Sequence, residues 1–185
     1  MTVSLIFGGA RSGKSAYAEQ LARQAEQQGK RIVYIATAAR GDSEMQQRIA
    51  HHQQRRPEHW TTVEEPVSLA AALHSYGQAG HLILVDCLTV WLSNLLFAEA
   101  REFPETGQID PPAVFSTERA ALLAALQGSA ADIVLVSNEV GMGIVPMGAV
   151  SRWFVDEAGR LNQAVAASAD QVYWVAAGLP LKLKG

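Results

Sequence analysis

Eight residues near the start of the chain constrain its fold more than any other stretch. Residues 8–15 read Gly-Gly-Ala-Arg-Ser-Gly-Lys-Ser and fit the pattern G-x-x-x-x-G-K-[ST] at every fixed position. Residues 3–7 before them are apolar, as in a buried strand, and residues 16–28 place alanines and a leucine at helical spacing. A strand, a glycine turn and a helix N-terminus together direct backbone N–H groups at a phosphate. A chance glycine turn would not need both flanking elements, so we predict a nucleotide-phosphate site. We call residues 8–15 the phosphate loop.

Three side chains are expected to act on the phosphates. In this pattern Lys14 reaches the β- and γ-phosphates, and the Ser15 hydroxyl holds Mg²⁺. Asp86 directly follows the apolar residues 81–85, a strand end from which a carboxylate can bind Mg²⁺ and neutralise phosphate charge. The alternative is that Asp86 only caps the following helix. Because the phosphate loop is present, we favour the metal role.

The rest of the chain alternates strands with helices. Expected strands span residues 3–7, 31–36, 61–63, 81–85, 133–137 and 172–176, and the last of these closes the series. Expected helices span residues 16–28, 44–56, 67–76, 89–100, 113–127 and 151–168. This order predicts an α/β fold with a mostly parallel sheet and helices on both faces. The loops after residues 7, 36, 85 and 137 should then face one another, because ligands bind beyond the carboxyl ends of such strands. Neither a repeat nor a linker divides the chain, so we expect one domain over residues 1–185.

Composition excludes several classes of protein. The formal net charge is −3, and no basic run extends beyond residues 55–56, which argues against a nucleic-acid surface. The apolar residues 82–98 are interrupted by Asp86, Ser93 and Asn94, so we expect no membrane span. Since the chain has a single cysteine, no intrachain disulfide can form, and we expect a cytoplasmic protein.

Histidine and arginine side chains cluster in the expected helix 44–56. His52 shares its helix face with Arg48, Arg55 and Arg56, whereas His51 lies on a neighbouring, less cationic face. Neighbouring cations would lower the pKa of an imidazole and keep it a neutral nucleophile that could contact a polyphosphate. The alternative is an ordinary solvated basic face, and the pattern alone does not decide between the two.

Two further segments are candidates for the rim of the site. Glu64 and Glu65 follow a short strand, so either carboxylate could reach a ribose hydroxyl or a base edge, or simply face solvent. Residues 138–148 contain three glycines and a proline directly after a strand. They predict a mobile loop over the site, with an ordinary long loop as the alternative.

Taken in order, these stretches resemble one known family over nearly the whole chain. The chain is similar to the bifunctional adenosylcobinamide kinase/adenosylcobinamide-phosphate guanylyltransferases of cobalamin biosynthesis. The matching positions are residues 8–15, 34–37, 44–45, 48–49, 52, 56–57, 60, 62, 64, 86–89, 94–96, 136–141, 143, 145–146, 159 and 162–163. The phosphate loop occurs in many enzymes, but its combination with the histidine helix and the Asn-Glu-Val-Gly segment at 138–141 is specific.

The resemblance implies a P-loop NTPase domain of the recombinase-like kind that catalyses two reactions. The first phosphorylates the aminopropanol hydroxyl of adenosylcobinamide with ATP or GTP. The second transfers GMP from GTP to that phosphate through a GMP-histidine intermediate, giving adenosylcobinamide-GDP and pyrophosphate. The family histidine lies four residues after the arginine of an Arg-Ile pair, which selects His52 and agrees with the face argument. The family also forms homo-oligomers, of which a trimer is the best-known form.

The resemblance further implies which residues contact the nucleotide. Relatives that carry Glu in place of Asp86 keep the charge, and those with an acid in place of Gln54 differ only at a peripheral contact. The implied contacts are Gly8, Gly9, Ala10, Arg11, Ser12, Gly13, Lys14, Ser15, Ala36, Thr37, Ala38, Gln53, Gln54, Arg55, Arg56, Glu64 and Asp86.

Two competing functions remain at this stage. One is a plain P-loop small-molecule kinase in which the histidine helix serves as a lid. The other is a regulatory module that changes shape with bound GTP. Intact Lys14, Ser15 and Asp86 argue against the regulatory module, because a pure binding module needs no metal-binding acid.

Overall fold

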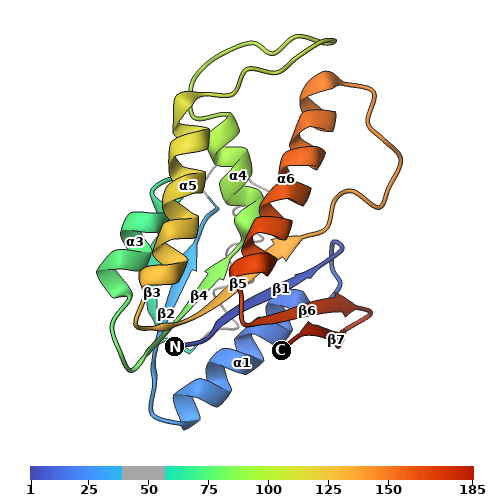
Figure 1. Cartoon of the computed structure of the whole chain (residues 1–185). Helices are drawn as coiled ribbons and strands as arrows, with labels where there is room; N and C mark the ends of the chain where they lie inside the picture. Colours follow the sequence, from blue (N-terminus) through green and yellow to red (C-terminus); the bar gives the residue numbers. More distant parts are fainter. Residues whose placement is uncertain (39–56) are drawn as a thin grey trace.

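The computed structural model describes residues 1–38 and 57–185 (Figure 1). The expected helix 44–56, with both of its histidines, lies outside the described residues. The strands are β1 (Val3–Gly8), β2 (Arg31–Ala36), β3 (Thr61–Glu64), β4 (His81–Asp86), β5 (Asp132–Asn138), β6 (Gln171–Ala176) and β7 (Leu179–Lys184). The helices are α1 (Lys14–Gln27), α3 (Leu69–Tyr76), α4 (Leu88–Leu96), α5 (Ala113–Gly128) and α6 (Ala149–Ser168).

All the described strands join one sheet in the order β3-β2-β4-β5-β1-β6-β7. Each neighbouring pair from β3 to β6 is parallel, and β7 runs antiparallel to β6. The alternation of strands and helices therefore gives the mostly parallel sheet that the sequence predicts. The strand β7 was not expected, since the sequence pattern closed the series at residue 176.

Helices cover both faces of this sheet (Figure 1). α1 lies on one face, and α3, α4, α5 and α6 lie on the other. Leu5, Ile83 and Leu135 are buried in the core that the four-helix face forms, whereas Ile6 and Leu84, their neighbours along β1 and β4, are buried on the α1 face. Strands covered on both sides are apolar at nearly every position, which explains the almost continuous apolar runs in the sequence.

Small side chains bring α1 close to the sheet. Ala18, Ala22 and Ala25 repeat at helical spacing, and all three are buried against the strands. This close approach fixes the N-terminus of α1 at the end of β1, where the phosphate loop joins the two. α1 begins at Lys14 rather than at residue 16, so its first turn includes the last residues of the phosphate loop.

In the described part of the chain, no helix is both long enough and apolar enough to cross a membrane.

Candidate nucleotide-binding site

The phosphate loop is held by its own backbone and by one buried cation. Gly13 is the N-cap of α1 and has a φ of 97°, a conformation that favours glycine. The Lys14 ammonium donates a hydrogen bond of 3.0 Å to the Gly9 carbonyl, and the side chain is only 8% exposed. Burial lowers the pKa of Lys14, and the negative charge of the nearby Asp86 carboxylate partly opposes this. The loop thus holds a positive charge in place before any phosphate binds.

The turn between β6 and β7 contacts the backbone of the phosphate loop. The Gly178 N–H donates a hydrogen bond of 2.8 Å to the Ser12 carbonyl. A Cβ on Gly13 would lie 2.9 Å from the Gly178 Cα, and one on Gly8 would lie 2.2 Å from the Val175 carbonyl oxygen. Two of the motif glycines are therefore required by contact with this turn and strand, as well as by approach to a phosphate.

Asp86 lies at the carboxyl end of β4 and is half-buried. Its carbonyl accepts a hydrogen bond of 3.2 Å from the Thr37 N–H. The Thr37 hydroxyl donates to the Cys87 carbonyl and accepts from the Cys87 N–H, both at 2.8 Å. The N-cap of α4 is Cys87, with no side-chain capping bond, so Asp86 does not cap that helix. Its carboxylate instead interacts electrostatically with Lys14.

A buried polar network joins the end of β5 to α4 and α6. The Ser137 hydroxyl donates a hydrogen bond of 2.6 Å to the Asn162 side-chain oxygen. The Asn138 N–H donates to the Thr89 hydroxyl at 2.7 Å, and the Asn162 amide donates to the Asn138 carbonyl at 3.2 Å. Ser137, Thr89 and Asn162 are all buried, so this network fixes where the chain leaves the sheet after β5.

The loops at the carboxyl ends of the central strands meet, as the sequence predicts. The Glu139 N–H donates a hydrogen bond of 2.9 Å to the Gly8 carbonyl, which joins the segment after β5 to the phosphate loop. Thr37 joins the segments after β2 and β4. Asn94 of α4 adds bonds of 2.7 and 3.0 Å to the carbonyls of Thr37 and Pro66.

The sequence of the chain also matches that of a known protein family. Residues 4–183 match the sequence profile of the family described as cobinamide kinase / cobinamide phosphate guanyltransferase. The chain belongs to this family. It is therefore a bifunctional cobinamide kinase and cobinamide phosphate guanylyltransferase of adenosylcobalamin biosynthesis, and it uses a nucleotide as substrate.

Individual relatives in this family are similar over almost their full length. The bifunctional adenosylcobalamin biosynthesis protein CobP of Pseudomonas aeruginosa is 51% identical over 181 residues, covering 98% of this chain and 96% of that protein. The bifunctional adenosylcobalamin biosynthesis proteins CobU of Escherichia coli and Salmonella typhimurium are 43% and 44% identical, each covering 97% of this chain and 98% of the relative.

A solved structure shares the fold. A KaiC-like protein from Pyrococcus horikoshii superposes with a TM-score of 0.51 at 14% sequence identity, covering 94% of this chain and 70% of that chain. At this identity the similarity concerns the fold alone. It confirms the predicted P-loop type of α/β fold with a mostly parallel sheet.

The structure places the family's expected nucleotide contacts in two groups. Residues 8–15 form the phosphate loop and the first turn of α1. Ala36 pairs in register with Asp86 on one side and with Glu64 on the other, so these three residues lie in a row at the carboxyl edge, and Thr37 and Ala38 follow directly. Residues 52–56, which include His52, lie outside the described residues.

The structure distinguishes Glu64 from Glu65 as the carboxylate that could meet a nucleotide. The Glu65 carboxylate accepts hydrogen bonds of 3.0 and 2.7 Å from the N–H groups of Val67 and Ser68, ahead of α3. Glu64 is exposed at the end of β3, in the row with Ala36 and Asp86. Glu64 is therefore the better placed of the two to meet a nucleotide.

The residues available for Mg²⁺ fit a nucleotide-bound ion. Among the described residues no group of three or more His, Cys, Asp or Glu side chains gathers as a metal cage would require. Mg²⁺ in nucleotide sites needs only one or two protein ligands, because phosphate oxygens and water complete its shell. Ser15, in the first turn of α1, and Asp86, which interacts with Lys14, have the oxygen donors that such a minimal set would need.

Sequence reasoning missed the supporting residues of the site. These are Gly178, Thr37 as a link between strands, and the network of Thr89, Ser137 and Asn162. Only the turn had a local signal in the sequence, because Ala177 and Gly178 separate two apolar runs. In the structure their φ values of 51° and 79° are typical of a tight hairpin turn.

Proposed function

We propose that this family member phosphorylates adenosylcobinamide with ATP or GTP and then guanylylates the product through a covalent GMP-histidine. In the first reaction the acceptor hydroxyl oxygen bonds to the γ-phosphorus, the bond to the β–γ bridging oxygen breaks, and the hydroxyl proton is released. In the second, an imidazole nitrogen bonds to the α-phosphorus and pyrophosphate leaves. An oxygen of the cobinamide phosphate then attacks the same phosphorus and frees the histidine.

The observation that carries the kinase half is the preorganised phosphate loop. Lys14 is buried against the Gly9 carbonyl, and the nearby Asp86 carboxylate partly offsets the lowering of the Lys14 pKa by burial. When nucleotide binds, the Lys14 ammonium exchanges the Gly9 carbonyl for phosphate oxygens. Fixed charge aimed at a transferring phosphoryl group in a water-poor site stabilises the transition state without reorganisation.

Ser15 and Asp86 would hold Mg²⁺ in this proposal. Bound there, the ion would neutralise negative charge on the phosphates while the phosphoryl group is transferred. The family resemblance implies nucleotide contacts at Ala36, Thr37, Ala38 and Glu64, and their position at the carboxyl ends of β2 and β3 supports this proposal.

His52 is the proposed nucleophile of the second reaction, on the strength of the Arg-Ile-x-x-His pattern and the arginines on its helix face. Gln53, Gln54, Arg55 and Arg56 would contact the nucleotide from the same segment. We also propose that the chain works as one domain, because strands near both of its ends share one sheet. By resemblance to the family, we further propose a cytoplasmic homo-oligomer, with a trimer favoured.

The covalent intermediate provides the test. GTP labelled at its α-phosphorus should leave label on the protein in a bond that is labile to acid and stable to alkali, as a phosphoramidate is. His52→Ala should abolish the label and retain part of the kinase activity, because Lys14 and Asp86 remain. The matched control His51→Ala should keep the label.

The opposite outcomes are equally informative. If the label survives in His52→Ala and disappears in His51→Ala, the nucleophile is His51, and the assignment to His52 is wrong. A wild type that never takes label under turnover conditions would exclude the covalent mechanism.

A further inference from the structure

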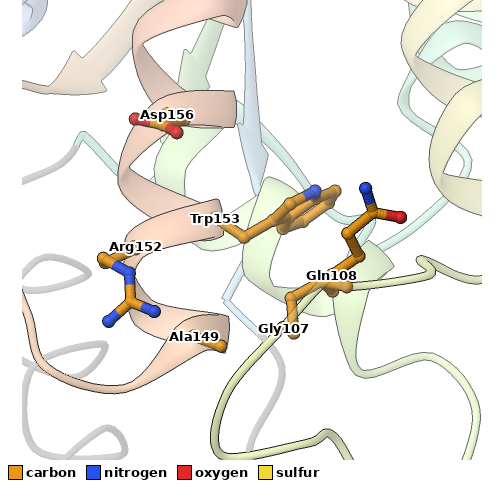
Figure 2. Close-up of a pocket in the computed structure, with 7 residues that line it drawn as sticks. Gly107, Gln108, Ala149, Arg152, Trp153 and Asp156 are labelled. Carbon is orange, nitrogen blue, oxygen red and sulfur yellow. The ribbon is translucent and has the colours of Figure 1, made fainter.

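A cavity outside the nucleotide site lies between two segments at the end of the helical layer. The loop that follows α4 and the first turns of α6 meet there (Figure 1). The cavity measures about 400 Å³ and is lined by Gly107, Gln108 and Ile109 from the loop and by Arg152, Trp153 and Asp156 from α6 (Figure 2). Nothing in the reactions described above uses these residues.

The lining suits a neutral ligand with apolar and amide groups. The Trp153 ring packs on Phe115 at a centroid distance of 4.8 Å, which fixes it as an apolar wall, and its indole points toward Gln108 in Figure 2. The Gln108 amide and the Asp156 carboxylate also line the cavity, and Asp156 interacts electrostatically with Arg160, one turn later on α6. Both groups are exposed and can bond to amides on a ligand.

The same lining disfavours a second nucleotide. The one cation among the lining residues, Arg152, donates through Nη1 to the carbonyls of Pro146 and Met147. Asp156 adds a negative charge to the wall. A phosphate in the cavity would therefore meet a carboxylate and an arginine that already donates hydrogen bonds to backbone carbonyls. It would not meet the row of N–H groups that the phosphate loop offers.

One segment connects the cavity to the phosphate loop. Residues 139–148 begin at the Glu139–Gly8 hydrogen bond of 2.9 Å and end at the carbonyls that Arg152 holds. Along this segment Met142, Ile144 and Met147 are 78%, 98% and 92% exposed. It therefore presents several exposed apolar side chains between the two sites.

The separation of the two sites suits a large acceptor. Asn162 of α6 bonds to the Asn138 carbonyl at the end of β5, and Arg152 lies ten residues earlier on the same helix. At about 1.5 Å per helical residue, the cavity lies roughly 15 Å along the helix axis from the sheet edge. Cobinamide is a flat macrocycle with methyl groups and amide-ended side chains at its rim, and one side arm carries the reacting hydroxyl.

We propose that this cavity binds the rim of the corrinoid acceptor. The inference rests on the proposed function and names the substrate subsite of the same enzyme. The Trp153 indole contacts an apolar edge of the macrocycle, and Gln108 and Asp156 bond to its amide side chains. The macrocycle lies over residues 139–148, so that the reacting arm reaches the phosphate loop. A cavity of this size holds only part of the macrocycle, and the rest stays outside it.

The test measures acceptor binding separately from nucleotide binding. Gln108→Ala and Asp156→Ala should each raise the KM for cobinamide by about tenfold, as expected when one hydrogen bond to a ligand is lost. Trp153→Ala should do the same, and Trp153→Phe should recover part of the loss. The KM for GTP and the α-phosphorus label should not change. Ser151→Ala, an exposed neighbour on α6 that does not line the cavity, should match the wild type in every assay.

Equilibrium dialysis with cobinamide, followed by its visible absorbance, gives the same comparison without turnover. Unchanged KM and dialysis binding in all three alanine variants, with an active wild type, would overturn this inference and leave the proposed function intact. A wild type that phosphorylates no cobinamide would overturn both. If the oligomeric state of these variants changes together with the KM, the cavity is a contact between subunits, and this outcome also overturns the inference.

Discussion

At the scale of single residues, Lys14 combines an energetic cost with the catalytic role that we propose for it. Its ammonium is buried, and its pKa lies below the ordinary value of 10.5 mainly because burial disfavours the charged form. Since the folded-state pKa is lower than that of the unfolded chain, the charge costs stability at pH values below the folded pKa. This cost shrinks as the pH rises toward 10.5.

Lys14→Met should therefore separate stability from activity. Phosphorylation of cobinamide should fall by about 10²–10³ or more, because fixed charge on the transferring phosphoryl group is lost. Without nucleotide, the unfolding temperature should equal or exceed that of the wild type, whereas the stabilisation by GTP should largely disappear. Thermal melts with and without GTP check both parts. A large drop in the melting temperature of the nucleotide-free variant would contradict this account of Lys14.

Cys87 should be chemically inert in the folded protein. Burial raises the pKa of its thiol to about 12, and the neighbouring Asp86 carboxylate acts in the same direction. At pH 8 the thiol stays protonated and out of reach, so iodoacetamide should add no mass to the native chain and one carbamidomethyl group to the urea-unfolded chain. Rapid modification of the native chain would show that the edge of the sheet beside Lys14 opens readily.

At the scale of elements, the β6–β7 turn acts as a support for the phosphate loop. Gly178 has a φ of 79°, and its N–H bonds to the Ser12 carbonyl. Gly178→Ala places a side chain in a left-handed conformation at a cost of about 1–2 kcal/mol. We expect the turn to relax away from the loop and the KM for GTP to rise several-fold.

Gly80 provides the matched control for this variant. It has a φ of 82°, and like Gly178 it has open space around an added Cβ. It directly precedes β4, however, and so lies at the amino end of that strand, away from the phosphate loop. Gly80→Ala should cost similar stability and leave the KM for GTP unchanged. Equal nucleotide affinity in the two variants would show that the turn does not act on the phosphate loop.

The network at the end of β5 should behave as one unit. Asn162→Ala leaves the buried Ser137 hydroxyl without the acceptor that lies 2.6 Å away, which costs about 1–3 kcal/mol. Urea unfolding measures this loss. In a double-mutant cycle, adding Ser137→Ala should cost less than it does in the wild type, because the partner is already gone. Strict additivity would mean that the hydroxyl and the amide do not depend on each other.

The sequence predicted the elements with a strong local pattern and missed those that depend on distant contacts. The phosphate loop and the buried central strands depend on neighbouring residues, and their predicted placement agrees with the structure to within a few residues. Every residue of β7 is exposed, and Pro180 interrupts its pattern, so only the turn at residues 177–178 gave a local signal of this strand, which forms against β6. The expected helix 89–100 ends at Leu96, because the residues beyond it are exposed and have no core to cover.

The same distinction applies to the site. The phosphate-loop motif predicts roles for Lys14 and Ser15, and the end of an apolar strand predicts one for Asp86. The structure brings Asp86 close enough to interact with Lys14, and the roles themselves stay predictions. The contact of Gly178 with Ser12 and that of Asn162 with Ser137 join residues far apart in the chain, and no short pattern reports such pairs.

At the scale of the whole molecule, one edge of the sheet brings together the described residues of the proposed site. The carboxyl ends of β1, β2, β4 and β5 carry the phosphate loop, Thr37, Asp86 and the start of the segment toward α6. The central claim is that this one edge serves both phosphoryl and guanylyl transfer.

The most direct test is to incubate the protein with GTP and adenosylcobinamide in Mg²⁺ and identify the products by mass. The account predicts adenosylcobinamide phosphate first and adenosylcobinamide-GDP after it, with pyrophosphate released in step with the second product. A reaction that stops at adenosylcobinamide phosphate, or that consumes GTP without modifying the corrinoid, would contradict it.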